Sequence, residues 1–387
     1  MAASLIIPPM ATASLMFIVA FVLLSLQHTD IVVAQLGVCY GRNGNNLPNA
    51  QATTDLYNYY GIGAMRLYAP DQSTLQALQG TGIELTLGVP NEDIQCIACD
   101  QQTANEWVET NIIPYATSIK YIAVGNEIHP SDEPTASSLH PAMQNIQNAI
   151  NSNNLTGQIK VSTAIDTSLI VNSYPPSKAE FGNLSFITPI IDFLTSNNSP
   201  LLVNIQPYTS YVNNQKDITL DFALFTACGT VFTDGETGKE YQNLFDAIYD
   251  AVFVAVGKVV GSPSQNGKYR KPPPRVVASE SGWPSKGGFS KKGRRHHRYH
   301  RHHRQVNGGL ECGGASGEAA TPENAKMYYT NLIKHVKKGT PLTEGEEIET
   351  YLFAMFDEDE KPGDESERFY GLFTPDQQPK YGILDIC

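Results

Sequence analysis

The sequence predicts a single (β/α)8 barrel of the α/β class, with a catalytic cleft at the carboxyl ends of its strands. Short apolar, β-branched runs alternate with stretches of helical periodicity eight times in a chain of 387 residues. The runs are apolar throughout, as expected of parallel strands that are covered on both faces. No glycine-rich phosphate turn follows an early run, which disfavours a doubly wound open sheet.

Eight strand-like runs have helical stretches between them. The strand-like runs are Leu36–Gly41, Ala64–Tyr68, Ile83–Val89, Ile119–Glu127, Lys160–Ile165, Leu201–Tyr208, Arg275–Glu280 and Ile348–Glu358. The helical stretches are Asn49–Tyr60, Asp71–Gln79, Ala104–Ala116, Leu139–Asn151, Ile187–Ser196, Tyr241–Val260 and Pro322–Lys337. Asp71 and Thr321 are expected to cap their helices, with Pro322 as the first helical residue.

The composition argues for an extracellular enzyme with an uncharged ligand. Hydrophobic residues make up 41% of the chain, enough for a sizeable core, whereas charged residues make up only 17%. The net charge of −12 argues against a nucleic-acid partner.

Residues 1–34 are expected to be a signal peptide, and residues 35–387 the mature catalytic domain. Met16–Leu26 has the length of a signal-peptide core and is too short to span a bilayer, and Ala34 is a small residue suited to cleavage. No later stretch predicts a transmembrane segment. Three glycosylation sequons, at Asn154, Asn183 and Asn197, agree with secretion.

Six cysteines are too sparse for a disulfide-scaffolded fold. Cys96 and Cys99 have zinc or redox spacing, but no second ligand pair and no thioredoxin-like context accompany them. A loop disulfide or plain thiols are the favoured interpretations, and no metal or cofactor is expected.

Two glutamates end strand-like runs, Glu127 in Tyr121–Glu127 and Glu280 in Arg275–Pro284. A carboxylate at the end of a core strand is expensive to bury and contributes nothing to packing. Two such carboxylates are what hydrolysis of a glycosidic bond requires, although either alone could be a structural carboxylate. Other polar or aromatic strand ends are expected in the same ring: Tyr40, Arg42, Tyr68, Asn204, Gln206, Tyr208, Trp283, Asp357 and Glu358.

The chain resembles the plant members of glycoside hydrolase family 17, the endo-1,3-β-glucanases and their relatives that act on mixed-linkage glucans. The motifs are GVCYGRNGNNLP, MRLY, VGNE, SESGWPS and ETYLFAMFDE, and the resemblance runs from Gln35 to about Ile386, broken by one insertion. It implies a (β/α)8 fold, a retaining mechanism and no cofactor.

Matched motif by motif, the resemblance makes Glu127 the general acid/base and Glu280 the nucleophile. It places Tyr68 beside the nucleophile, with a capping aromatic as the alternative, and Asn126 where it can donate to a sugar 2-hydroxyl. The remaining residues given a substrate-binding or supporting role are Tyr208, Trp283, Glu358, Lys361 and Glu367.

These supporting assignments leave alternatives open. Glu358, Lys361 and Glu367 could instead belong to a solvated acidic loop. Trp283 could stack on a sugar or pack at the barrel rim. Gln206-Pro207-Tyr208 departs from the expected Tyr-Pro-Tyr, which puts one aromatic subsite contact in doubt.

A basic insertion at about residues 286–317 is expected to be disordered. Its Lys286–Arg304 portion holds eight Lys or Arg and five His, with no acid. A solvated loop or an exon-boundary artefact is favoured over an anion-binding arm, and a histidine metal site is least favoured.

The predicted function is a secreted, monomeric endo-1,3-β-glucanase acting on callose, fungal wall glucan or laminarin, in wall turnover or defence. The expected location is the cell wall, with the vacuole as the alternative. A mixed-linkage 1,3-1,4-β-glucanase and a non-catalytic wall-glucan-binding protein are the competing functions.

Overall fold

Eight parallel strands close into a barrel in the computed structural model, which describes residues 36–261, 272–288 and 318–382. Around the barrel the strand order is β1-β12-β11-β8-β5-β4-β3-β2. The strands are β1 (Leu36–Tyr40), β2 (Ala64–Leu67), β3 (Glu84–Val89), β4 (Ile119–Asn126), β5 (Lys160–Asp166), β8 (Leu201–Asn204), β11 (Val276–Ser281) and β12 (Thr350–Leu352). Each matches one predicted run, so the predicted fold class is confirmed.

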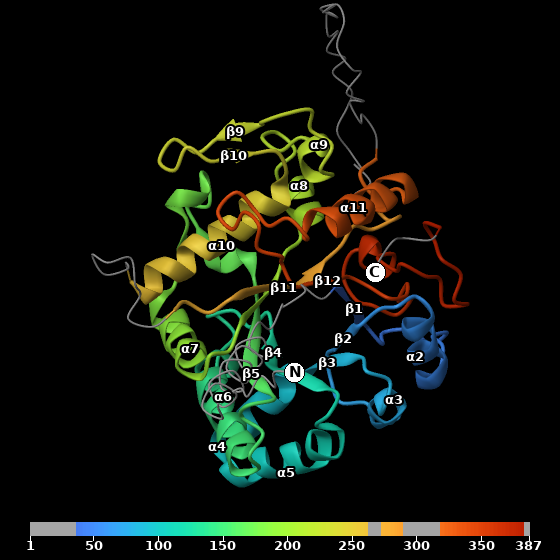
Figure 1. Ribbon diagram of the computed structural model, residues 1–387, viewed down its shortest axis with the longest axis vertical. Helices are drawn as coiled ribbons and strands as arrows, with labels where there is room; N and C mark the ends of the chain where they lie inside the picture. The colour runs from blue at the N-terminus through green and yellow to red at the C-terminus, as the bar shows by residue number, and fades with distance from the viewer. Residues whose placement is uncertain (1–35, 262–271, 289–317, 383–387) are drawn as a thin grey trace, which may run out of the picture. The chain divides into compact units, whose positions relative to one another are not determined.

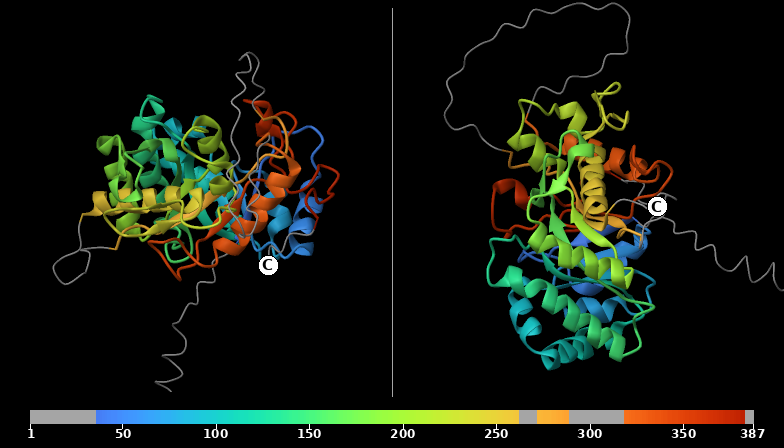
Figure 2. Two further views of the ribbon diagram at one scale, coloured as in Figure 1. Left: turned by 90° about the horizontal axis from the view of Figure 1, so that it is seen from above. Right: turned by 90° about the vertical axis from the view of Figure 1, so that its left-hand side faces the viewer.

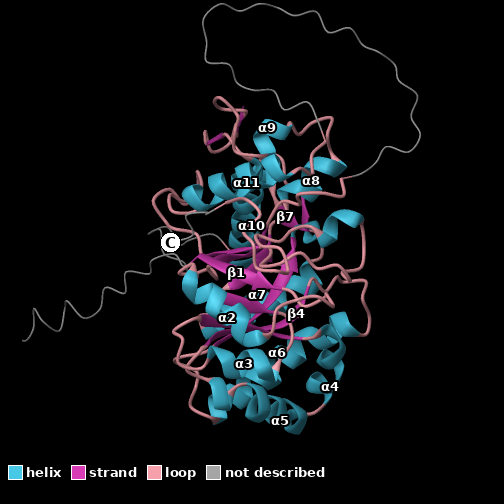
Figure 3. Ribbon diagram, turned by 90° about the vertical axis from the view of Figure 1, so that its right-hand side faces the viewer, coloured by secondary structure: helices cyan, strands magenta, loops and turns pink. Residues whose placement is uncertain are grey.

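Helices surround the barrel strands, which gather at the centre in Figure 3. In Figure 1 and in the right-hand view of Figure 2, α8 to α11 lie toward one end and α2 to α6 toward the other. The helices are α2 (Ala50–Tyr59), α3 (Gln72–Leu78), α4 (Ile94–Cys99), α5 (Gln101–Asn111), α6 (Thr135–Ser152), α7 (Leu184–Asn197), α8 (Pro207–Asn213), α9 (Leu220–Ala223), α10 (Leu244–Val260) and α11 (Pro322–His335). Two small hairpins, β6 (Ile170–Val171) with β7 (Glu180–Phe181) and β9 (Phe232–Thr233) with β10 (Glu240–Tyr241), lie outside the barrel.

Side-chain caps start most of these helices, because the first backbone N–H groups of a helix have no internal acceptor. Asp71 accepts from the N–H of Thr74, and Thr321 accepts from that of Asn324. Both predicted caps are therefore confirmed. Asn183, one of the predicted glycosylation sites, caps α7 by accepting from Phe186 N.

The barrel core is apolar except where its strands carry the site and where their amino ends meet. All six residues of β11 are buried, as expected of a strand covered on both faces. At the amino ends, the Glu349 carboxylate accepts from the Tyr121 hydroxyl at 3.0 Å and pairs with Lys120 at 3.1 Å and Arg275 at 3.0 Å. This cluster neutralises a buried charge at the end of the barrel opposite the cleft.

Two predicted strand ends were wrong, and one helix was missed. The sixth strand ends at Asn204 rather than Tyr208, since Pro207 begins α8 and proline suits the first turn of a helix. The eighth strand covers only Thr350–Leu352, and Phe356 instead bridges to Phe373. Helix α4, which contains Cys96 and Cys99, was not predicted, because six residues are too few to show a helical period.

Several predictions fall outside the described residues, including the signal peptide and most of the basic insertion. Among the residues described, no helix combines the length and apolar character needed to cross a bilayer. Asn154 and Asn183 are exposed, whereas Asn197 is half-buried and donates its Nδ2 to Phe193 O at 2.8 Å. Glycosylation at these three positions stays a prediction.

Candidate active site

The two glutamates are turned into the barrel mouth by β-bulges. In β4, Ala123 pairs with Ser162 but Asn126 pairs with Ala164, so the strand carries one extra residue. In β11, Ala278 pairs with Val203 but Glu280 pairs with Asn204, which again adds one residue. A bulge bends its strand and re-aims the side chains beside it.

The bulge in β4 depends on Gly125. Its φ of +73° is accessible to glycine, and an added Cβ would lie 2.6 Å from Ile128 Cδ1 and 2.8 Å from Ile94 Cδ1. Glu127 follows with a φ of +54°, uncommon for a residue with a side chain, while its N–H donates to Ala164 O at 2.9 Å. Backbone outliers of this kind cluster at functional sites.

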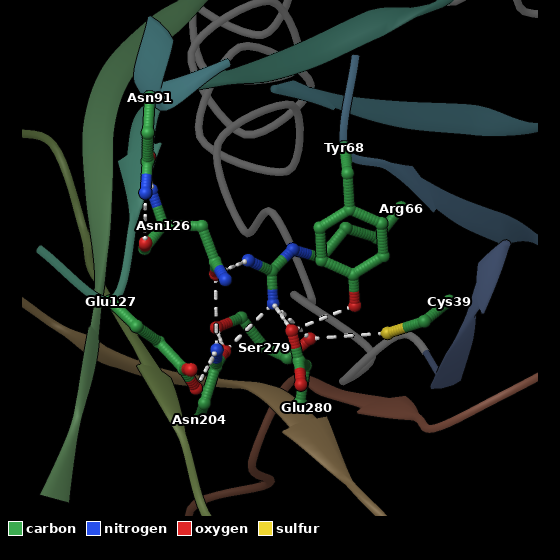
Figure 4. Close-up of polar contacts among 9 residues, drawn as sticks. All are labelled: Cys39, Arg66, Tyr68, Asn91, Asn126, Glu127, Asn204, Ser279 and Glu280. Atoms are coloured by element: carbon green, nitrogen blue, oxygen red, sulfur yellow. Dashed lines mark hydrogen bonds and ion pairs between the residues drawn. The ribbon is translucent and has the colours of Figure 1, made fainter. Parts of the chain in front are cut away.

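Arg66 is the centre of the hydrogen-bond network shown in Figure 4. This side chain on β2 is buried, and its Nη1 donates to Asn204 Oδ1 at 2.7 Å and to Glu280 Oε1 at 3.0 Å. Its Nη2 donates to Asn126 Oδ1 at 2.7 Å. One planar guanidinium thus fixes three side chains from β4, β8 and β11 relative to one another.

The carboxylate of Glu280 receives a second donor from Tyr68, whose hydroxyl lies 2.7 Å from Oε1. Two donors, one of them a cation, converge on one oxygen of a carboxylate that is only 5% exposed. Such bonds stabilise negative charge and hold the carboxylate in one orientation.

Glu127 has the opposite environment. Burial, followed by the negative charge of Glu280, raises its pKa from 4.5 to about 7, and a hydrogen bond from Asn204 Nδ2 at 2.7 Å opposes the shift. The site therefore contains a carboxyl that holds its proton near neutral pH beside a carboxylate paired with a cation. General acid catalysis needs a carboxyl of this kind.

The amide of Asn126 is fixed with its NH2 group available. Its Oδ1 accepts from Arg66 Nη2 and, at 3.1 Å, from Asn204 Nδ2. Asn91 holds the backbone of Asn126 from both sides, accepting from its N–H at 2.8 Å and donating to its carbonyl at 2.9 Å. Because Asn126 Oδ1 accepts two hydrogen bonds, these contacts fix which side of the amide carries the oxygen and which carries the NH2 group.

Tyr68, Asn126, Glu127 and Glu280 line an open cavity of about 540 Å3 at the carboxyl ends of the strands. Glu358 lies in its wall, buried against Gly41, and accepts from the N–H of Asn43 at 2.8 Å. Burial raises the pKa of Glu358. Lys361 pairs with Glu367 at 3.2 Å and lies over the Phe353 ring. The predicted site residues that line the cavity are Tyr40, Arg42, Tyr68, Asn126, Glu127, Gln206, Glu280, Glu358, Lys361 and Glu367.

Trp283 and Tyr208 do not line this cavity. Trp283 is fully buried, its ring packs 5.2 Å from Tyr208 and 5.4 Å from Tyr328, and its Nε1 donates to Ala319 O. A sugar cannot stack on a covered ring, so the cleft role given to Trp283 is corrected to packing. Tyr208 is likewise buried, on α8, because the strand to which it was assigned ends earlier.

Sequence reasoning missed Arg66 and gave Asn204 no specific role. An arginine inside the otherwise apolar run of β2 was the available signal, since a buried charge requires a partner. Among the described residues, no group of three or more His, Cys, Asp or Glu is placed to hold a metal ion. Cys96 and Cys99 are free and exposed.

Comparison with known proteins agrees with this geometry. Residues 36–309 and 307–385 match the model of glycosyl hydrolases family 17. A glucan endo-1,3-beta-glucosidase of Vitis vinifera is 48% identical over 373 residues, covering 95% of each chain. A solved structure of CJP38, a beta-1,3-glucanase and pollen allergen of Cryptomeria japonica, superposes with a TM-score of 0.77 at 39% identity, covering 91% of this chain and 99% of that one. One of two plant beta-glucan endohydrolases with distinct substrate specificities superposes with a TM-score of 0.75 at 38% identity, covering 90% and 99%. The chain belongs to glycosyl hydrolase family 17.

Proposed function

We propose that this chain is a secreted, retaining endo-1,3-β-glucanase. The observation that carries the proposal is the unequal pair of carboxyl groups in one open cavity. Glu127 has a pKa of about 7, whereas Glu280 accepts from Arg66 and Tyr68. Retaining glycosidases use one protonated and one ionised carboxyl on either side of the scissile bond.

In the proposed reaction Glu127 gives its proton to the glycosidic oxygen while Glu280 attacks the anomeric carbon. The leaving chain departs with that proton, and a glycosyl ester forms on Glu280. Glu127, now ionised, then takes a proton from a water molecule that attacks the same carbon and frees Glu280. The NH2 of Asn126 is the group that would bind the 2-hydroxyl, an interaction that strengthens in the transition state.

The substrate assignment is supported by the named relatives and by the open cavity. A cavity open to solvent accepts an internal segment of a polysaccharide, as endo-cleavage requires. We propose 1,3-β-glucans of plant or fungal walls as substrates, with wall turnover or defence as the role and the cell wall as the location. The expected signal peptide and the three sequons support secretion.

The assay is reducing-sugar release from laminarin and barley mixed-linkage glucan, measured side by side with the secreted protein. The proposal expects faster release from laminarin, and the first anomer detected by NMR is expected to be the β-anomer. Faster release from the mixed-linkage glucan would move the specificity to that substrate.

Glu280→Gln separates an enzyme from a glucan-binding protein. The substitution is expected to abolish hydrolysis while glucan binding persists, because the amide keeps the shape of the carboxylate but not its nucleophilicity. Absence of hydrolysis in the unsubstituted protein, with binding intact, would support a non-catalytic binder instead.

A further inference from the structure

Two exposed thiols on α4 have no part in the fold or in the proposed reaction. Ile94 and Ile97 are buried, whereas Cys96 and Cys99 are exposed and free. Because residues three positions apart lie on the same face of a helix, the two thiols are neighbours on the outer face of α4.

We propose that Cys96 and Cys99 form a reversible dithiol–disulfide site whose state affects the cleft. The oxidant is a low-molecular-weight disulfide such as oxidised glutathione. One protein thiolate attacks a sulfur of that disulfide, forming a mixed disulfide and releasing one thiol. The second protein thiolate then displaces the remaining half, so the protein loses two hydrogens and the oxidant becomes two thiols.

The other described cysteines are not available for this chemistry. Cys39 is buried, and burial together with the negative charge of Glu280 raises the pKa of its thiol to about 12, which suppresses the reactive thiolate. Cys228 is already in a disulfide bond. Disulfide bonds persist in oxidising environments, in which an exposed thiol pair would also meet oxidants.

Helix geometry makes the proposed bond a strained one. Side chains three positions apart in a helix have Cβ atoms about 5–6 Å apart, whereas a disulfide needs about 3.5–4.5 Å. Closure must therefore tighten the last turn of α4. Asn145 donates its Nδ2 to the carbonyls of Ile97 and Ala98, at 2.8 and 3.2 Å, so the tightening pulls against α6. Strained, exposed disulfides are easily reduced, as a reversible site requires.

The amino end of α4 connects directly to the active cavity. Ile94 packs where a Cβ on Gly125 would lie, and Asn91 holds both backbone polar groups of Asn126. Asn126 precedes the proposed acid, Glu127. If α4 moves when its last turn tightens, Ile94 and Asn91 move with it. The backbone that positions Asn126 and Glu127 is then displaced.

Peptide mapping tests the site itself, and it does not depend on the proposed activity. The folded, full-length protein is treated with oxidised glutathione, alkylated, digested and weighed. We expect the peptide with Cys96 and Cys99 to lose the mass of two hydrogens and to resist alkylation. Dithiothreitol should restore both the original mass and the alkylation of the two thiols. Continued alkylation of both thiols, or a mixed disulfide that persists on one of them, would overturn the proposal.

Activity tests the connection to the cleft, and this readout rests on the proposed function. Oxidation is expected to lower kcat on laminarin by about tenfold, because a displacement transmitted through α4 should be smaller than the misplacement of about 1 Å that can reduce a rate by about a hundredfold. The variant Cys96→Ser/Cys99→Ser should have the kcat of the reduced parent, and the oxidant should not change that kcat. Equal kcat in the reduced and disulfide forms would refute the effect of the thiol pair on the cleft. An inactive reduced parent would instead contradict the proposed function, and the peptide mapping alone would then show whether the disulfide forms.

Discussion

Arg66→Lys should reduce catalysis strongly while keeping the positive charge in place. The guanidinium donates through Nη1 to Asn204 and Glu280 and through Nη2 to Asn126. A lysine ammonium is a single point on a flexible stem, so it cannot occupy both positions. If it replaces Nη1, the bond to Asn126 is lost.

The size of the effect follows from that one bond. A hydrogen bond to a charged group contributes about 1.5–3 kcal/mol, and about 1.4 kcal/mol corresponds to a tenfold change in rate. We therefore expect kcat/KM on laminarin to fall about 10- to 150-fold, mainly through kcat, because the 2-hydroxyl contact of Asn126 strengthens in the transition state.

Arg275→Lys is the matched control. It changes an arginine paired with a buried glutamate at the opposite end of the barrel, and it should leave kcat/KM unchanged. The assay compares kcat and KM of both variants with the parent, after circular dichroism has shown that both are folded. A folded Arg66→Lys protein with kcat/KM within twofold of the parent would refute the role given to Arg66.

Three further predictions concern pH, the closed end of the barrel and the bulge in β4. As pH rises through about 7, kcat/KM should fall, because the reaction needs protonated Glu127. The same raised pKa means that the free energy of unfolding decreases as pH rises from 4.5 toward 7. Denaturant unfolding should show that Glu127→Gln removes this pH dependence of stability. Glu349→Ala should lower the free energy of unfolding by about 1–3 kcal/mol, because the buried Tyr121 hydroxyl loses its acceptor and Arg275 loses its salt bridge, while Lys120 keeps Glu84; a full loss of kcat/KM in a protein that is still folded would contradict the structural role of Glu349. Gly125→Ala should lower both melting temperature and kcat, since the added Cβ meets Ile128, whereas Gly157→Ala, with open space around it, should leave kcat unchanged; equal effects of the two would argue against the bulge.

Much of the fold could be predicted because apolar residues dominate most of the barrel strands. Glu127 and Glu280 stood out for the complementary reason, since each is a charge at the end of such a run. The position of a residue along its strand, and so its distance from the end of the barrel, can be read from the sequence alone.

What the sequence could not show depends on the closed barrel. Arg66 has meaning only once β2, β4, β8 and β11 bring its partners together, and those partners lie 60 to 214 positions away. Trp283 illustrates the opposite error. Trp283 follows the end of β11, the strand of the nucleophile, by two residues, yet its ring is covered by Tyr208 and Tyr328, which belong to helices outside the barrel.

Because of the two bulges, the positions of the carboxylates depend on the number of residues in β4 and β11 as well as on their identity. Side chains alternate between the two faces of a strand, so one residue more or fewer exchanges the inward and outward sets. Deleting Ser279 would remove the extra residue of β11, and with it the bend that aims Glu280 and the contacts of Ser279 with Arg66 and Asn204. A single-codon deletion there would disable the proposed nucleophile even though every glutamate remained in the chain. Insertions and deletions are therefore better tolerated in the loops between barrel units than within the last three residues of β4 or β11.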